Sequence, residues 1–512
     1  MSAITQLLCN KFGGIRHKNS VFSDELITAQ DIQNVELYYT GSNGGVGIRT
    51  MKGNTPVIEL PNEKVIDIFQ SVQQRETLFL IYTENANYGK FYLYKDGELT
   101  LKKDNIQKSG VCNGFDVAQG YSDLFFFTNG KEMFTFELGA TTEIVEMNNL
   151  VSRLKYDGDA DYQIVKGFGA TIFDNRLFIF NKNVLFWSVR ANIYDFSTNN
   201  SDWTTSAGYL ECTKNITAIH EYLGSLAVFY KDSSQLLTVS DNNFSLGEDS
   251  PGGCASYNSL VFHGTDLYFY DDTKKGVFAF QQVVNGDKTL SDNLAVDIQE
   301  ELISIDSSNL DKIRTLSVVL SERNEIWWVV PTNDSYYSKI LIYDYLKGEW
   351  VKRKSQKINS VKVINNQLYS AGDTKVYKEY SSDLFDNEYI PHYYNCSPCN
   401  LGAYNTLKVL VFPPRVSFDL PYLNKFKVKY IKNCDTSKKP KIKLIKPKYK
   451  NLLIWGQGIW GQDYWKSKST NAVGKFPNAN FKILEIEIYT DSKNQNFSIK
   501  NIEFSKIKIK QV

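Results

Sequence analysis

The chain has 512 residues, 42% hydrophobic and 14% aromatic, which leaves room for two or three domains and favours strands over helices. Seven sparse cysteines argue against a disulfide-stapled secreted fold. The N-terminal residues 1–19 hold no apolar core, so no signal peptide is expected. No run approaches about 18 apolar residues, so membrane insertion is not expected either. The net charge of +1 excludes a uniformly acidic or basic protein. It conceals a division, because residues 391–512 hold 22 Lys and Arg against 7 Asp and Glu, a net charge of +15, which leaves −14 for residues 1–390.

Residues 1–55 are expected to form an extended N-terminal arm with turns, because glycine is frequent there. The glycines are Gly13, Gly14, Gly41, Gly44, Gly45, Gly47 and Gly53. The stretch from Gly41 to Gly47 lacks the Gly-Lys-Ser/Thr ending of a phosphate loop, so turns that need positive φ explain it better. A short helical turn is expected within residues 21–34.

Residues 56–390 repeat one pattern, in which a polar turn is followed by a run of aromatic and aliphatic residues. The runs are Leu78–Ile81, Leu124–Phe127, Leu177–Phe180, Leu226–Phe229, Leu267–Tyr270, Ile326–Val329 and Leu368–Tyr369. Their first residues are 46, 53, 49, 41, 59 and 42 positions apart. Hairpins at this spacing predict a β-propeller of about six or seven blades, because each blade has two apolar faces that only neighbouring blades can cover. A pair of β-sandwiches is the alternative. A helix is expected within residues 291–310.

Two short motifs could hold a metal, and each has a simpler interpretation. Asp157, Asp159 and Asp161 alternate as in a calcium loop, but the glycine and glutamate that such a loop needs further on are missing, so a solvated acidic loop is expected. Cys396 and Cys399 form a lone Cys-x-x-Cys, whereas a structural zinc site normally needs a second pair. No cofactor or metal is therefore expected.

Catalytic motifs do not emerge from the sequence. The four histidines are scattered, with no nucleophile elbow or zinc-protease motif around them, and the Asp-box repeat of sialidase-type propellers does not occur. We therefore expect no enzymatic activity. A glycoside hydrolase or lyase would need two close carboxylates in a central pocket.

Residues 391–512 are expected to form a separate, basic β-sandwich domain. Residues 425–450 hold 11 lysines and one acid, Asp435. The alternating lysines predict one strand face that either keeps a sheet edge soluble or docks an acidic partner or nucleic acid. The candidate docking residues are Lys425, Lys427, Lys429, Lys438, Lys439, Lys441 and Lys443.

The string from Trp455 to Trp465 is the most distinctive local sequence in the chain. Trp455, Trp460 and Trp465 recur at a spacing of five residues, separated mainly by Gly and Gln. Packing in a core or subunit interface is the usual role of such residues, and an exposed aromatic ladder could instead stack on sugars. A propeller that binds host glycans through these tryptophans is the alternative function.

Several segments resemble the tail nozzle, or tail-stabilisation, proteins of short-tailed bacteriophages. In the N-terminal arm they are Phe12-Gly13-Gly14-Ile15, then Gln33-Asn34-Val35-Glu36, then Gly47-Ile48-Arg49 through Gly53. Further segments are Trp187-Ser188, Asp202-Trp203, Leu223–Ser234, Gly252–Tyr270 and Tyr343-Asp344-Tyr345 with Gly348 and Trp350. The resemblance extends to about residue 410.

This resemblance implies a structural virion protein assembled in the host cytoplasm. Six copies would form a ring below the portal, in contact with portal, adaptor and other tail proteins, and the genome would pass through the ring without specific binding. An acidic channel lining would repel DNA phosphates, and the charge of −14 over residues 1–390 is compatible with that role. The basic residues 391–512 would dock against a neighbour. The resemblance carries no catalytic residues.

Overall fold

The computed structural model describes all residues except 1–2, 10, 17–25, 41–43, 71–77, 118–123, 138–143, 148–165, 197–205, 241–242, 283–287, 306–315, 399–406, 419–424, 436, 447–471, 494 and 511–512. The described chain is all-β, with 42 strands and one short α-helix, α1 (Gln299–Ile303). No described helix is long and apolar enough to cross a membrane. The chain forms two compact units. Unit 1 comprises Met1–Thr55, Leu341–Ser355 and Tyr380–Val512, and unit 2 comprises Pro56–Ile340 and Gln356–Glu379.

Seven four-stranded sheets follow one another along the chain, and six of them take consecutive strands. Sheet 1 contains β7 (Lys64–Gln70), β8 (Leu78–Glu84), β9 (Gly89–Lys95) and β10 (Glu98–Ile106). Sheet 2 contains β11 (Asn113–Asp116), β12 (Leu124–Thr128), β13 (Met133–Glu137) and β14 (Ile144–Glu146). Sheet 3 contains β15 (Gly169–Phe173), β16 (Arg176–Asn181), β17 (Val184–Trp187) and β18 (Gly208–Glu211). Sheet 4 contains β19 (Ile216–Tyr222), β20 (Ser225–Tyr230), β21 (Ser234–Ser240) and β22 (Asn243–Leu246).

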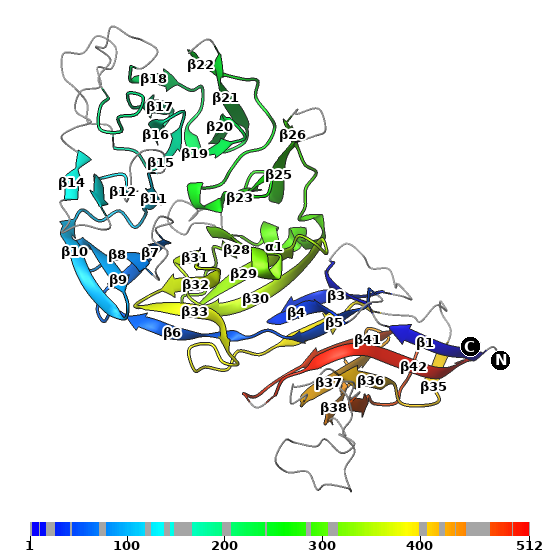
Figure 1. Ribbon diagram of the computed structural model, residues 1–512. Helices are drawn as coiled ribbons and strands as arrows, with labels where there is room; N and C mark the ends of the chain where they lie inside the picture. The colour runs from blue at the N-terminus through cyan, green and yellow to red at the C-terminus, as the bar shows by residue number, and fades with distance from the viewer. Residues whose placement is uncertain are drawn as a thin grey trace, which may run out of the picture. The chain divides into compact units, whose positions relative to one another are not determined.

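The last three sheets complete the series, whose colour in Figure 1 runs from blue in sheet 1 through cyan and green to yellow. Sheet 5 contains β23 (Val261–His263), β24 (Asp266–Asp271), β25 (Gly276–Gln282) and β26 (Lys288–Leu290). Sheet 6 contains β27 (Leu316–Leu320), β28 (Glu325–Val330), β29 (Tyr337–Asp344) and β30 (Glu349–Gln356). Sheet 7 contains β31 (Ser360–Ile364), β32 (Gln367–Gly372), β33 (Lys375–Ser382) and β6 (Gly53–Glu59). The fourth strand of sheet 7 thus precedes sheet 1 in the chain.

Each apolar run found in the sequence lies in the second strand of a sheet, which confirms the repeated hairpins. The runs fall in β8, β12, β16, β20, β24, β28 and β32. In this position a strand has a partner on both sides, so its side chains are the most fully covered. In β20 and β28 all six residues are buried.

Neighbouring sheets contact one another in a series that returns to its start, and most of the contacts are between first strands. β7 contacts β11, β11 contacts β15, and β15 contacts β19. Farther along, β23 contacts β27, β27 contacts β31, and β31 contacts β7. Sheets 4 and 5 are joined by an apolar cluster that includes Ala218, Phe229 and Phe269. Every sheet therefore packs on the next one, and sheet 7 packs on sheet 1.

Aromatic side chains fill the space between adjacent sheets. Phe91 of sheet 1 is fully buried, and its ring contacts those of Phe127, Phe134 and Phe136 from sheet 2 at centroid distances of 5.2 to 5.7 Å. A similar cluster joins sheet 7 to sheet 1 around Ile81 and Ile364. The high aromatic content of the sequence is used here, because large rings cover the apolar face of each sheet.

Unit 1 is built around a single 14-stranded sheet. Its main path runs β38 (Lys441–Ile445), β37 (Phe426–Lys432), β41 (Leu484–Tyr489), β34 (Tyr393–Cys396), β3 (Leu26–Gln33), β2 (Lys11–Ile15), β5 (Val46–Thr50), β42 (Ser498–Lys510), β35 (Leu407–Leu410) and β40 (Asn480–Phe481). Four more strands pair beside this path: β1 (Ala3–Cys9), β4 (Val35–Tyr39), β36 (Arg415–Phe418) and β39 (Ala472–Lys475). Most pairings are antiparallel, and β2 pairs parallel with both β3 and β5.

Residues 1–55 and 391–512 were expected to form separate parts, but their strands share this sheet. In its main path β3, β2 and β5 lie between strands of residues 391–512. β34 pairs with β3, and β42 pairs with β1 and β5. The glycines misled the sequence interpretation, because several of them allow close packing rather than turns. A Cβ atom on Gly14 would lie 2.3 Å from the carbonyl oxygen of Trp350, whereas Gly44 does occupy a turn at φ +67°.

The helix expectations were met only in part. The segment expected to make a helical turn within residues 21–34 contains strand β3, because pairing with β2 and β34 outweighs its weak helical pattern. Within residues 291–310 the described helical part is α1, preceded by a 3-10 turn at Val296–Ile298.

Candidate docking surface

The candidate docking lysines lie around one hairpin at the end of the main path of the unit 1 sheet. Lys427 and Lys429 are in β37, and Lys441 and Lys443 are in β38. Side chains paired directly across antiparallel strands share a face. Lys427 pairs with Leu444, whereas Val428 pairs with Lys443. The lysines of the two strands therefore lie on opposite faces of the hairpin, not on one.

Two of the three lysines of β37, Lys427 and Lys429, are neutralised by acids of unit 1. The ammonium group of Lys427 bonds the carboxylate of Asp491, and the ammonium group of Lys429 lies 2.6 Å from a carboxylate oxygen of Glu487 in β41. The hydrogen bond to Asp491 raises the pKa of Lys427, and the reciprocal contact lowers the pKa of Asp491. These two lysines therefore contribute less positive potential at the protein surface than their spacing in the sequence indicates.

The lysines of β38 bind backbone instead of acids. Lys441 donates to the carbonyl of Asn478 at 2.8 Å, and Lys443 donates to the carbonyl of Lys475 at 3.0 Å. Both side chains are exposed, so their positive charge faces solvent without a carboxylate beside it in these bonds.

The other candidate lysines lie at the ends of the two strands. Lys438 pairs with Asp435 at 3.0 Å, and the pKa of that carboxyl falls to about 2 because Ser437 and Lys438 donate to it. Lys439 is exposed, and Lys425 precedes β37, where it forms an isolated bridge with Asn496.

Two aliphatic residues of β38 are exposed. The sequence analysis, which considered only the lysines of this segment, missed them. Ile442 is 52% exposed and Leu444 is 38% exposed. They lie on the face that carries Lys427 and Lys429. The alternation Lys-Ile-Lys-Leu at residues 441–444 could have revealed them, because a strand with one buried face would hide its aliphatic side chains.

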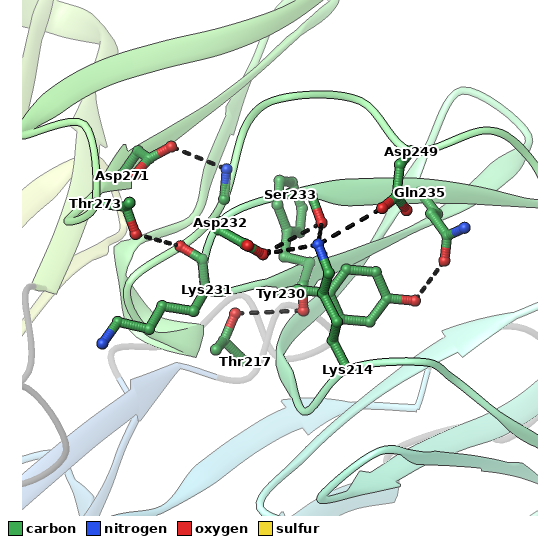
Figure 2. Close-up of polar contacts among 12 residues, drawn as sticks. Lys214, Thr217, Tyr230, Lys231, Asp232, Ser233, Gln235, Asp249, Asp271 and Thr273 are labelled. Carbon is green, nitrogen blue, oxygen red and sulfur yellow. Dashed lines mark hydrogen bonds and ion pairs between the residues drawn. The ribbon is translucent and has the colours of Figure 1, made fainter.

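A second charged cluster lies on unit 2, where Lys214 bridges two loops of sheet 4 (Figure 2). Its ammonium group lies 3.0 Å from Asp232, 2.8 Å from the hydroxyl of Ser233 and 3.6 Å from Asp249. The bond to Asp232 raises the pKa of Lys214 and lowers that of Asp232, so both groups stay charged at neutral pH. Such a cluster tethers loops but offers no proton donor or acceptor suited to catalysis near pH 7.

The space among the first strands of unit 2 is crossed by the 3-10 helix η3 (Tyr257–Ser259), which links sheets 4 and 5. The hydroxyl of Tyr257 donates to the carbonyl of Ala170 in β15 at 2.8 Å, and Ser317 of β27 donates to the carbonyl of Asn258 at 3.1 Å. The same turn contacts β19. One short turn that touches sheets 3, 4 and 6 must lie between them, so it occupies the inner space of unit 2.

His392 of unit 1 has a strongly shifted pKa. Its Nδ1 lies 3.2 Å from the hydroxyl of Thr490, and its Nε2 lies 3.2 Å from the carbonyl oxygen of Met51. Burial, and to a smaller extent the nearby charge of Arg353, lower the pKa of His392 to about 4, although the hydrogen bond to the Met51 carbonyl opposes the shift. The imidazole is therefore neutral at pH 7 and joins the N-terminal and C-terminal segments of unit 1.

Three sets of candidate residues lie wholly or partly outside the described residues. Trp455, Trp460 and Trp465 do, and so do Asp157, Asp159 and Asp161. Of the two motif cysteines, Cys396 is buried in β34, and Cys399 is not among the described residues. Within the part of the chain that the structure describes, no group of three or more His, Cys, Asp or Glu residues could hold a metal ion.

The chain was compared with known protein families, curated proteins and solved structures. No family model matches the chain, and no curated protein matches it. Among solved structures, the chain is similar to the computationally designed Ika8 protein, with 9% identity, a TM-score of 0.35 and coverage of 64% of this chain and 99% of that one. It is also similar to the N-terminal domain of Nup159, with 11% identity, a TM-score of 0.36 and coverage of 69% and 97%. At these TM-scores neither similarity identifies a fold or a function.

Proposed function

We propose that the seven four-stranded sheets form a seven-bladed β-propeller and that the chain is a structural subunit of the tail nozzle of a short-tailed bacteriophage. In this proposal about six copies form a ring in the virion tail, in contact with portal, adaptor and other tail proteins, and the genome passes through the ring. The protein has no catalytic role in this function.

Three properties of the seven sheets support the propeller. All are four-stranded, each packs on the next and the seventh on the first, and the seventh takes strand β6 from before the first. Completing the last blade with an upstream strand fixes the two ends of the series together, which leaves no open end. Two facing β-sandwiches would not produce contacts that return from β31 to β7.

The observation that carries the nozzle proposal is the convergence of the motifs that resemble this family. Phe12–Ile15 lies in β2, Val35 begins β4, and Gly47–Arg49 lies in β5, which pairs with both β2 and β4. The later motif reaches the same place, because Glu349, next to Trp350, accepts a hydrogen bond of 2.7 Å from the backbone N–H of Gly14. Motifs about 300 residues apart in the sequence thus meet in one part of the structure. This is expected if they serve one structural role.

The proposed channel runs between copies of the chain rather than through the propeller. Tyr257 and its turn lie between sheets 3, 4 and 6, across the path that a duplex would take through the propeller. By composition unit 2 holds 27 Lys and Arg against 41 Asp and Glu, a net charge of −14, so a channel lined by this unit would repel phosphates.

The assembly is tested by native mass spectrometry and negative-stain microscopy of the purified full chain over a range of concentrations and salt. We expect closed rings of about six copies, because a heterologous interface whose rotation closes generates a ring. A tight dimer at every concentration would contradict the proposal, since a two-fold interface cannot build a nozzle.

A further inference from the structure

We propose that the free edge of β38 binds an extended, acidic segment of a partner protein, which adds to the unit 1 sheet as a further strand. This inference goes beyond the nozzle proposal and does not depend on it. It replaces the broad docking face that the lysine spacing predicted with one strand edge and one class of ligand.

The first argument is the position of β38 in the sheet. β38 pairs with β37 and with no other strand among the described residues. Its outer edge therefore presents N–H and C=O groups that another strand can pair with, which is the geometry used in β-augmentation.

The second argument is the exposure of β38 on both faces. The four residues from Lys441 to Leu444 are all exposed, and only Ile445 is buried. Two aliphatic side chains in this exposed stretch are costly to leave in water, since burial of apolar surface contributes about 25 cal/mol per Å². An added strand would cover part of Ile442 and Leu444 with its own side chains.

The third argument is the charge on the opposite face. The ammonium groups of Lys441 and Lys443 lie over the carbonyls of Asn478 and Lys475, so they are drawn onto the face of the sheet. Exposed Lys439 and Lys446 flank the strand. A partner strand with acids on this face would meet positive charge along its whole length.

These observations define the ligand and favour protein over nucleic acid. The alternation of Lys441 and Lys443 with Ile442 and Leu444 calls for a partner strand in which acidic and apolar residues alternate. Nucleic-acid phosphates accept hydrogen bonds from N–H groups, but they cannot donate to the carbonyl groups of a strand edge. The edge can therefore be fully paired only by another polypeptide.

The test uses the full chain and a fluorescein-labelled decapeptide of alternating Glu and Val with blocked termini. We expect saturable binding, with slower hydrogen exchange at residues 441–445 when the peptide is bound. The same peptide with a central Val replaced by Pro should bind at least about 10-fold more weakly, because proline removes a donor and blocks strand pairing.

Two double variants separate the edge from the overall charge of unit 1. Lys441→Glu with Lys443→Glu should weaken peptide binding by about 10-fold or more, whereas Lys482→Glu with Lys493→Glu, which changes two exposed lysines elsewhere in the unit, should change it less than about 2-fold. Equal losses in both variants would overturn the proposal. So would tight binding of the proline peptide, or displacement of the peptide by a 20-base-pair DNA duplex without protection of residues 441–445.

Discussion

The two units of this chain are held together by different kinds of interaction. Unit 2 packs sheets that, apart from the one completed by β6, are each formed from a short stretch of chain, and aromatic rings fill many of the spaces between them. Unit 1 assembles strands from distant segments, and polar groups connect them at several points, including the partly buried Glu349 and the buried His392. The difference shows that repetition can be stabilised by apolar burial alone, whereas a unique long-range arrangement also uses specific hydrogen bonds to fix its register.

The opposite net charges of the units sharpen this contrast. Unit 1 holds 31 Lys and Arg against 16 Asp and Glu, a net charge of +15, whereas the net charge of unit 2 is −14. Within unit 1 much of the positive charge lies on strands such as β37 and β38, where lysine alternates with apolar residues.

The largest expected effect comes from breaking the aromatic packing of unit 2. Phe91→Ala should destabilise this unit by about 3–5 kcal/mol, because it removes a fully buried ring that contacts several others and leaves a cavity. Urea unfolding, with hydrogen exchange to locate the loss, measures it. Phe262→Ala, at a ring that is 40% exposed, is the control and should cost about 1 kcal/mol or less. Equal losses in both variants would argue against packing between sheets as the main stabilising term.

The next effect concerns the dependence of unit 1 on pH. The folded pKa of His392, about 4, lies below its ordinary value of 6.5, so its contribution to stability is complete above pH 6.5 and is lost as the pH falls toward 4. The loss should reach about 3 kcal/mol, since one pKa unit corresponds to about 1.4 kcal/mol. Urea unfolding of the wild type and of His392→Gln at pH 7, 5.5 and 4.5 measures the difference.

The control for this experiment is His263→Gln, at a histidine of unit 2. This variant should keep the pH dependence of the wild type, whereas His392→Gln should flatten it. If both variants retain the full acid sensitivity, carboxylates rather than His392 govern the acid unfolding of unit 1.

A smaller loss is expected from Glu349→Gln in unit 1. The carboxylate of Glu349 accepts hydrogen bonds from the N–H of Gly14 at 2.7 Å and from the guanidinium of Arg16 at 2.8 Å. A glutamine would turn an N–H group toward one of these donors, at a cost of about 1–3 kcal/mol. Faster hydrogen exchange across residues 11–16 would report it, and Asp383→Asn, at an exposed position of the same unit, should leave that exchange unchanged.

The smallest expected effect is that of Tyr257→Phe in the turn inside unit 2. This change deletes the hydroxyl that bonds the carbonyl of Ala170 but keeps the ring, so the cost should be about 1 kcal/mol. Thermal unfolding of the variant beside the wild type checks the value. A loss as large as that of Phe91→Ala would mean that this turn, rather than the aromatic clusters, holds the sheets together.

The seven hairpins could be predicted because each is a local event. A turn and an apolar run such as Leu226–Phe229 lie within one strand pair, so the pattern is visible in a short stretch of sequence. The sheet of unit 1 could not be predicted in this way, since its contacts join residues as distant as Gly14 and Glu349, 335 positions apart. Nothing in a local pattern specifies which of many strands will be a neighbour.

The candidate docking site could likewise be predicted only in its local features. The alternation of lysines in residues 425–443 did predict strands, and β37 and β38 are found there. The division of these lysines between two faces depends on the register of β37 against β38 and of β37 against β41. Register follows from tertiary packing, so the acids at Asp491 and Glu487 that neutralise β37 were not visible as its partners.

The use of β6 to complete sheet 7 has a consequence for synthesis on the ribosome. β6 emerges early, but its partner β33 is made more than 300 residues later. Six sheets can form in order as the chain leaves the exit tunnel, while β6 has to wait as an unpaired strand. Nascent chains released before residue 375 would leave β6 unpaired and accessible to chaperones and proteases. The pairing of β6 with β33 would therefore distinguish complete from truncated products in the cell.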